Sequence, residues 1–168
     1  MNLTKTLLVD LWYLRLWMGS EAFESQVNLV TDIAGVHRSL ASATAPGPGQ
    51  RVVAIQAVHH ALMRKYPVHI AVNITSMQEM DPPVIAAYFD DLRAIAARRT
   101  LFFYCCNREE KALPDGTVTR FAEYPWKEGD RHIVDGPCPW HQFYYALMPP
   151  FYRPYDGPIR HRLVELAP

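Results

Sequence analysis

The sequence of 168 residues lacks several features that would assign it to a class at once. No apolar run approaches the ~18 residues of a membrane-spanning helix. The 17 basic and 17 acidic residues cancel, and no basic patch is interleaved with aromatic residues, so we expect neither nucleic acid nor a membrane as a partner. The 3 cysteines, two of them adjacent, do not make a disulfide framework, which favours a cytoplasmic protein.

The sequence also lacks the local motifs of several kinds of catalytic or cofactor site. It has no G-x-S-x-G turn, and Cys105 and Cys106 lie in an apolar run where thiols are usually unreactive. The segment Pro46–Gly49 is a poor nucleotide-binding turn, because its two prolines remove backbone N–H donors. The histidines at 59, 60 and 69 lack the helical i, i+4 pair or the cysteine partners of a zinc signature, so we assign no metal ligands.

The composition that is present predicts one folded domain. The chain is 49% hydrophobic, and its length suits a single domain over residues 1–168. Residues 43–50, rich in proline and glycine, are expected to form a loop. The density of proline and aromatic residues over 124–158 predicts a long irregular segment there.

Apolar runs and helical periodicity alternate along the chain and predict an α/β fold. The strands expected from these runs are Thr6–Leu11, Arg51–Ala57, Val68–Ile74, Thr100–Cys106, the half-buried Thr117–Phe121 and a final edge strand, Ile159–Leu166. The helices expected are Tyr13–Phe23, His59–Lys65 and one that begins at Asp81. A turn is predicted at Pro114, Asp115 and Gly116.

The stretch from His69 to Arg93 is the most informative. Its first part, rich in β-branched residues, predicts a strand covered on both faces in a parallel sheet. Asp81 is a good helix N-cap and Pro82 suits the first helical position. Open α/β sheets bind ligands beyond the carboxyl ends of their strands. The polar residues expected there are Asn73, Thr75, Ser76, Gln78 and Glu79.

Each candidate also has a structural interpretation. Glu79 can take a proton from a hydroxyl that Asn73 orients, or it can cap the following helix. Asp10, at the end of the first predicted strand, can bind a ribose diol or cap a helix. Four further residues can form an aromatic and amide wall that suits a sugar, or they can be ordinary packing residues: Tyr104, Asn107, Tyr124 and Trp126.

Several separated segments together resemble the sugar O-methyltransferases. They are NITSMQEM at 73–80, the following AYFDDLR, FFYCCNRE at 102–109 and EYPW at 123–126 with Asp130 nearby. The resemblance implies a class I fold, a Rossmann-like three-layer sheet with antiparallel C-terminal strands, S-adenosylmethionine as cofactor and a carbohydrate hydroxyl as acceptor. It also implies that Asp10 holds the ribose, that Glu79 is the base and Asn73 its orienter, and that the acceptor is lined by Ser76, Gln78, Tyr104, Asn107 and Trp126.

The resemblance does not include the first strand of the family's sheet. LLVDLWYLRLWM at 7–18 resembles the family's second strand and helix, so the first strand and its glycine-rich turn have no counterpart. In the family the first strand lies between the second and the fourth, and its loss leaves open sheet edges. We therefore expect a truncated or split methyltransferase, inactive alone, that pairs with an upstream split-gene chain or with itself. The alternative is a non-catalytic α/β module that binds a small molecule or completes another chain.

Overall fold

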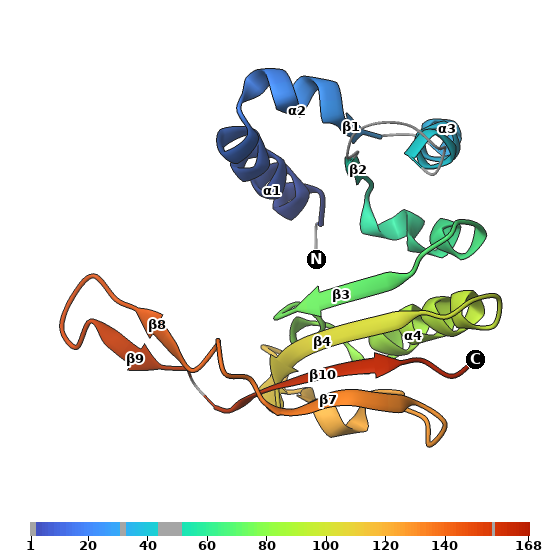
Figure 1. The fold of residues 1–168 in the computed structure, drawn as a ribbon. Coiled ribbons are helices and arrows are strands. Elements are labelled where there is room, and N and C mark those ends of the chain that lie inside the picture. Colours follow the sequence, from blue (N-terminus) through green and yellow to red (C-terminus); the bar gives the residue numbers. More distant parts are fainter. Residues whose placement is uncertain (1–2, 31–32, 44–51, 156) are drawn as a thin grey trace. The chain divides into compact units, whose positions relative to one another are not determined.

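The computed structural model describes residues 3–30, 33–43, 52–155 and 157–168. The chain divides into two compact units, an N-terminal unit of Met1–Pro67 and a C-terminal unit of Val68–Pro168 (Figure 1). The loop predicted at 43–50 lies outside the described residues, apart from Ala43. Within the described residues, every helix is too short or too polar to cross a membrane.

The N-terminal unit is built around a short parallel strand pair. Its elements are α1 (Leu3–Met18), α2 (Ser20–Gln26), β1 (Val27–Leu29), α3 (Ile33–Ala43), β2 (Val52–Ala54) and the 3₁₀ helix η1 (Ala57–Lys65). β1 and β2 pair in parallel from Val27 opposite Val52 to Leu29 opposite Ala54. The described part of β2 and η1 confirm the strand expected in 51–57 and the helical link expected at 59–65.

The strand predicted at Thr6–Leu11 was wrong, because these residues lie inside helix α1. The run is rich in leucine, a good helix former, and contains one β-branched residue after Thr6, Val9. Leu7, Leu11, Leu14 and Met18 follow helical spacing and pack into one hydrophobic cluster with the buried Val27 and Ala54. Asp10 is therefore an exposed residue in the middle of a helix and does not end a strand.

The C-terminal unit contains a mixed four-stranded sheet in the order β3-β4-β10-β7 (Figure 1). These strands are β3 (Ile70–Ile74), β4 (Phe102–Arg108), β10 (Ile159–Glu165) and β7 (Arg131–Pro137). β3 runs parallel to β4, and β10 runs antiparallel to both of its neighbours. The strands predicted at 68–74 and 100–106 are confirmed. The final strand is also confirmed, but it lies inside the sheet and not at its edge.

Helix α4 (Pro82–Ala96) covers one face of this sheet. It begins at Pro82 as predicted, although among the described residues no hydrogen bond from the Asp81 side chain caps it. Phe89 is 1% exposed and meets Phe103 of β4 edge to face at 5.5 Å and Trp126 at 5.0 Å. Such pairs add about 0.5–1.5 kcal/mol each beyond the area they bury. This aromatic cluster is the centre of the C-terminal core.

The strand β3 is less covered than its sequence predicted. Ile70, Val72 and Ile74 share the sheet face opposite α4, and they are 59%, 58% and 44% exposed. Among the described residues β3 pairs with β4 alone, so its other edge is open. The prediction of a strand buried on both faces was wrong, because β-branched content reports strand propensity and not the presence of a second covering layer.

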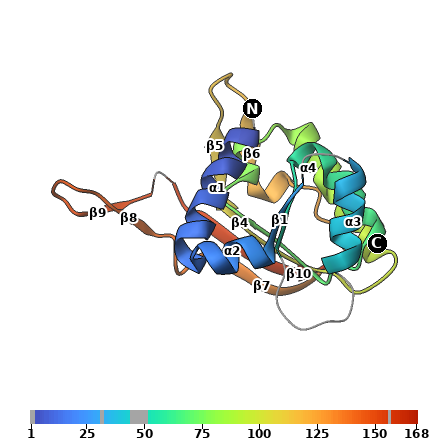
Figure 2. The ribbon, with the colours of Figure 1, turned by 90° about the horizontal axis from the view of Figure 1, so that it is seen from above.

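Two hairpins and two 3₁₀ turns complete the C-terminal unit. β5 (Glu110–Ala112) and β6 (Val118–Arg120) pair around the predicted turn, where Gly116 adopts φ 89°. β8 (Phe143–Tyr145) pairs with β9 (Tyr152–Pro154) in an arm that extends beyond the sheet (Figure 2). The short helices are η2 (Met77–Glu79) and η3 (Phe121–Glu123). Segment 124–158, predicted to be irregular, thus contains β7, β8 and β9, because its aromatic and β-branched residues favour strands between the prolines.

Candidate functional site

A network of amide side chains joins the carboxyl ends of the parallel strands β3 and β4. The Asn107 side-chain amide donates to Asn73 Oδ1 at 3.0 Å, and the Asn73 amide donates to Ser76 Oγ at 2.6 Å. Asn73 Oδ1 also accepts the Met77 backbone N–H at 3.1 Å. Because parallel strands end at the same edge of a sheet, residues 34 positions apart meet here. We call this group of residues, with Gln78 and Glu79, the strand-end network.

Gln78 ties the loop after β3 to the end of β4. Its backbone N–H donates to Asn107 Oδ1 at 3.2 Å, and its side-chain oxygen accepts the Arg108 backbone N–H at 2.7 Å. Its carbonyl accepts from Thr119 Oγ1 of β6 at 3.0 Å. Asn107 is 0% and Gln78 7% exposed, so both amides hold the loop in place and present little surface to a ligand.

The accessible groups of this edge are Ser76 and Glu79. Glu79 accepts a hydrogen bond from the Gln78 amide at 3.2 Å, and Lys111 Nζ lies 3.7 Å from the same carboxylate, whose side chain is 41% exposed. Thr75, just before them, has φ 55° and donates its N–H to the Cys106 carbonyl at 2.8 Å. A β-branched residue is strained in this left-handed conformation. The loop is therefore held in one shape, with a carboxylate fixed at its rim.

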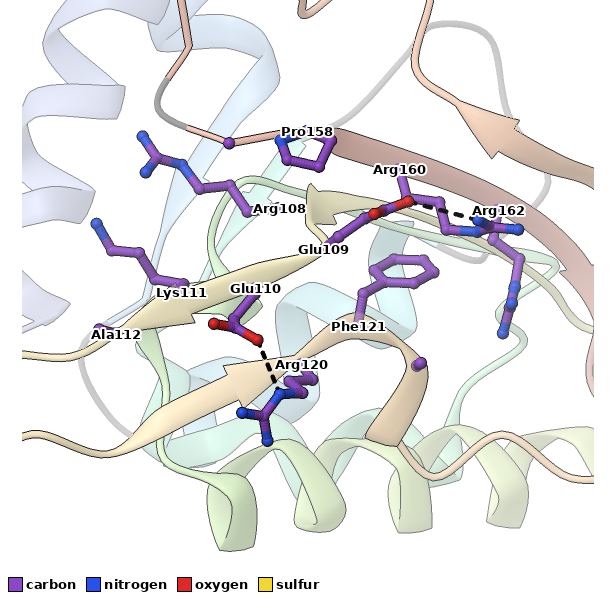
Figure 3. A pocket seen from close by; sticks show the side chains of 12 residues that line it. Arg108, Glu109, Glu110, Lys111, Ala112, Arg120, Phe121, Pro158, Arg160 and Arg162 are labelled. Atoms are coloured by element: carbon purple, nitrogen blue, oxygen red, sulfur yellow. Dashed lines mark hydrogen bonds and ion pairs between the residues drawn. The ribbon is translucent and has the colours of Figure 1, made fainter.

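A cavity of about 810 Å³ lies beside this edge, between the β5–β6 hairpin and the start of β10 (Figure 3). Its lining carries four arginines and a lysine against two glutamates. Arg120 Nε lies 2.9 Å from Glu110, and Arg160 Nη1 lies 3.5 Å from Glu109. Lys111 lines the cavity, and its ammonium group lies 3.7 Å from the Glu79 carboxylate of the strand-end network. Glu123 and Asp135 of β7 also pair with arginines of this lining, so the cavity offers both donors and acceptors to a polar ligand.

Asp135 of β7 holds the Arg160 side chain in position. The Arg160 Nε donates to Asp135 at 2.6 Å, and Arg162 Nη2 donates to the other oxygen at 2.7 Å. Burial acts to raise the pKa of Asp135, but the hydrogen bonds from both guanidinium groups outweigh it and hold that pKa below its usual range. The carboxylate therefore stays ionised and keeps both arginines in place.

Within the C-terminal unit, the predicted site residues Tyr104 and Trp126 do not lie at this edge. Tyr104 points to the opposite sheet face, with its hydroxyl 3.3 Å from His161 Nδ1, and burial raises its pKa to about 12. Trp126 packs in the core, where its indole N–H donates to the Phe121 carbonyl at 2.8 Å and the Arg162 guanidinium lies 4.5 Å from its ring. Asp10 belongs to the N-terminal unit. Trp126 is therefore a packing residue of the core, as the second of its two interpretations proposed.

Sequence patterns missed two groups of residues. The basic lining of the large cavity, notably Lys111 and Arg160, was not singled out, although alternation in IRHRLVEL places Arg160 and Arg162 on one strand face. No metal ligand was predicted from the sequence, yet Cys106, Cys138 and His141 bring two sulfurs and a ring nitrogen within 4.8 Å of one another. The spacing Cys138-x-x-His141 was the available signal.

Comparisons with protein-family models, with curated proteins and with solved structures found no match for this chain. The fold and the site are therefore interpreted from their own geometry.

Proposed function

We propose that this chain forms the acceptor half of a methyltransferase that moves a methyl group from S-adenosylmethionine to a sugar hydroxyl. The observation that carries the proposal is the strand-end network. Five of the residues expected at the acceptor side lie together at the carboxyl edge of two parallel strands: Asn73, Ser76, Gln78, Glu79 and Asn107. This is the edge at which open α/β sheets bind ligands.

The residues present suit the acceptor's share of the chemistry. Transfer to a hydroxyl forms an O–C bond, and the hydroxyl proton must leave to a base. Glu79 is the carboxylate at the rim, held between the Gln78 amide and Lys111. Asn73 orients the Ser76 hydroxyl, which can hydrogen-bond a neighbouring sugar hydroxyl. The two amides behind them fix these positions to the sheet, which favours an aligned acceptor.

The described residues do not supply a matching cofactor site. Their glycines with positive φ, Gly19, Gly116 and Gly157, lie between two helices, in the β5–β6 turn and before β10, and none follows a strand into a helix. Asp10 lies within a helix. We therefore assign no step to cofactor-binding residues. The open edge of β3 is where a partner's first strand would pair in the arrangement that the family resemblance implies.

Calorimetry with S-adenosylmethionine and S-adenosylhomocysteine tests this proposal. The chain alone and the chain mixed with its upstream neighbouring gene product are compared, and binding in the mixture alone is expected. In the mixture Glu79→Gln should lose methyl transfer and keep cofactor binding, while the exposed Glu123→Gln should keep both. Tight cofactor binding by this chain alone would contradict a split enzyme, and binding in neither sample would contradict methyl transfer.

A second function, a non-catalytic module that completes another chain, is favoured by one observation. The open strand β3 presents Ile70, Val72 and Ile74 beside an unpaired backbone edge in the described residues. Such an edge is a template for strand addition. Complex formation with the upstream product, without cofactor binding and unaffected by Glu79→Gln, would select this function.

A further inference from the structure

We propose that Cys106, Cys138 and His141 bind a zinc ion on the sheet face opposite helix α4. Cys106 lies in β4, and Cys138 follows β7 directly, with its N–H donating to the Ile159 carbonyl of β10 at 2.8 Å. His141 comes three residues later, before β8. The three ligand atoms lie within 4.8 Å of one another, although they come from separate parts of the sheet.

The two nitrogen–sulfur distances in this cluster match the corresponding edges of a zinc tetrahedron. His141 Nδ1 lies 3.6 Å from Cys106 Sγ and 3.6 Å from Cys138 Sγ. With Zn–S of about 2.3 Å and Zn–N of about 2.05 Å, tetrahedral geometry gives an S···N separation of about 3.6 Å. The His141 ring nitrogen thus faces both sulfurs at once. This is the arrangement that a shared zinc ion requires.

The chemistry of the ligands and their surroundings suits zinc. Cys106 is 0% and Cys138 1% exposed, and Tyr104 and Tyr155 pack against them. Binding replaces the two thiol protons, which leave to solvent, with two Zn–S bonds. Two thiolates, one dication and a neutral imidazole sum to zero charge, so the complex can remain buried without an uncompensated charge. Thiolate and imidazole are the ligands that zinc prefers.

Three protein ligands leave the fourth position of the ion open. Cys138 and His141 line a separate cavity of about 350 Å³, together with Gln142, Phe143 and Tyr155. Water or a small electron-pair donor in this cavity would complete the tetrahedron. The ion would also fasten the turn at the base of the β8–β9 arm to β4. The side chains of Cys105 and Asn107, at alternate positions of the same strand, point to the opposite face of the sheet, so the zinc ligands and the proposed acceptor residues lie on different faces.

Metal titration of the reduced full-length chain tests the site. We expect one zinc per chain in competition with a chromophoric chelator, and tighter binding as pH rises because two thiol protons are released. Cobalt added in place of zinc should give the intense visible absorption of tetrahedral thiolate coordination. His141→Ala should weaken zinc binding by roughly 100-fold or more, because it removes one of three ligands.

Cys105→Ala is the matched control, since this thiol is adjacent in sequence but points to the other sheet face. It should retain the metal, whereas Cys138→Ser should lose it. Circular dichroism checks that each variant is folded, and the cobalt spectrum of the unaltered chain needs no substitution. An unaltered chain that binds neither metal, or a folded His141→Ala chain that binds zinc as tightly as the parent, would overturn the assignment.

Discussion

The buried ion pair between Arg93 and Asp130 offers the sharpest test of packing in the C-terminal unit. Arg93, on α4, donates to both oxygens of Asp130 and to the carbonyls of Ala167, at 2.7 Å, and Pro125, at 3.0 Å. Asp130 also accepts the backbone N–H groups of Lys127, at 2.9 Å, and Ala167, at 3.0 Å. The two side chains are 9% and 0% exposed. The pair thus fastens the helix to the chain end.

Asp130→Asn should therefore lower the free energy of unfolding by about 3–5 kcal/mol, because it leaves a buried guanidinium without its counter-charge. This is a large share of the ~5–15 kcal/mol of a typical domain. Urea denaturation followed by circular dichroism measures the loss. The double variant Arg93→Met with Asp130→Leu should be more stable than Asp130→Asn, since it removes both charges.

Glu110→Gln is the control, because it removes one partner of the exposed pair with Arg120 and should leave the urea midpoint unchanged within error. If Asp130→Asn also leaves the urea midpoint unchanged, the buried ion pair does not stabilise the C-terminal unit and the reasoning is refuted.

The same pair sets a pH dependence. Burial acts to raise the pKa of Asp130, but hydrogen bonds from Arg93 and from two backbone N–H groups outweigh it and lower that pKa. A carboxyl whose pKa is lowered by folding stabilises the protein above its unfolded pKa of about 3.9, and the contribution disappears as pH falls through the lower folded pKa. Stability of the parent chain should therefore fall below about pH 4, with a shallower slope in Asp130→Asn.

Three further substitutions test the local geometry by urea denaturation. Asn107→Leu should cost about 1–3 kcal/mol, because it strands the Gln78 N–H and removes one of the two donors to Asn73 Oδ1; an unchanged midpoint would contradict the strand-end network. Thr75→Asn should stabilise by about 0.5–1 kcal/mol, since asparagine tolerates φ 55°, and a loss would show that the threonine is not strained. Tyr124→Phe should not destabilise, because the buried hydroxyl has no hydrogen-bond partner among the described residues; a clear loss would reveal one.

Local patterns predicted the elements around the strand-end network. The runs that became β3 and β4, the start of α4 at Pro82 and the turn at Gly116 are each encoded within a few neighbouring residues. The carboxyl ends of the two parallel strands could be placed together because parallel strands end at one edge, and Asn73 and Asn107 do meet there.

The failures concern information that neighbouring residues do not carry. The apolar run at 6–11 fits both a strand and a helix, and the choice is decided by Leu7, Leu11 and Leu14 packing on Val27 and its neighbours. The exposure of Val72 depends on which layer covers the sheet. β10 lies inside the sheet because β7 pairs with its second edge, and a long, proline-rich stretch of sequence separates these two strands.

One error could have been removed from the sequence alone. Successive residues of a strand point to opposite faces, so Tyr104 and Asn107, three positions apart in β4, cannot both line one wall. Asn107 and Cys105 share the face of α4, whereas Tyr104 and Cys106 share the other. The same alternation that removes Tyr104 from the acceptor side places it against Cys106 and Cys138, where the proposed zinc site lies. The two adjacent cysteines therefore belong to different chemistry, a packed core on one face and a metal site on the other.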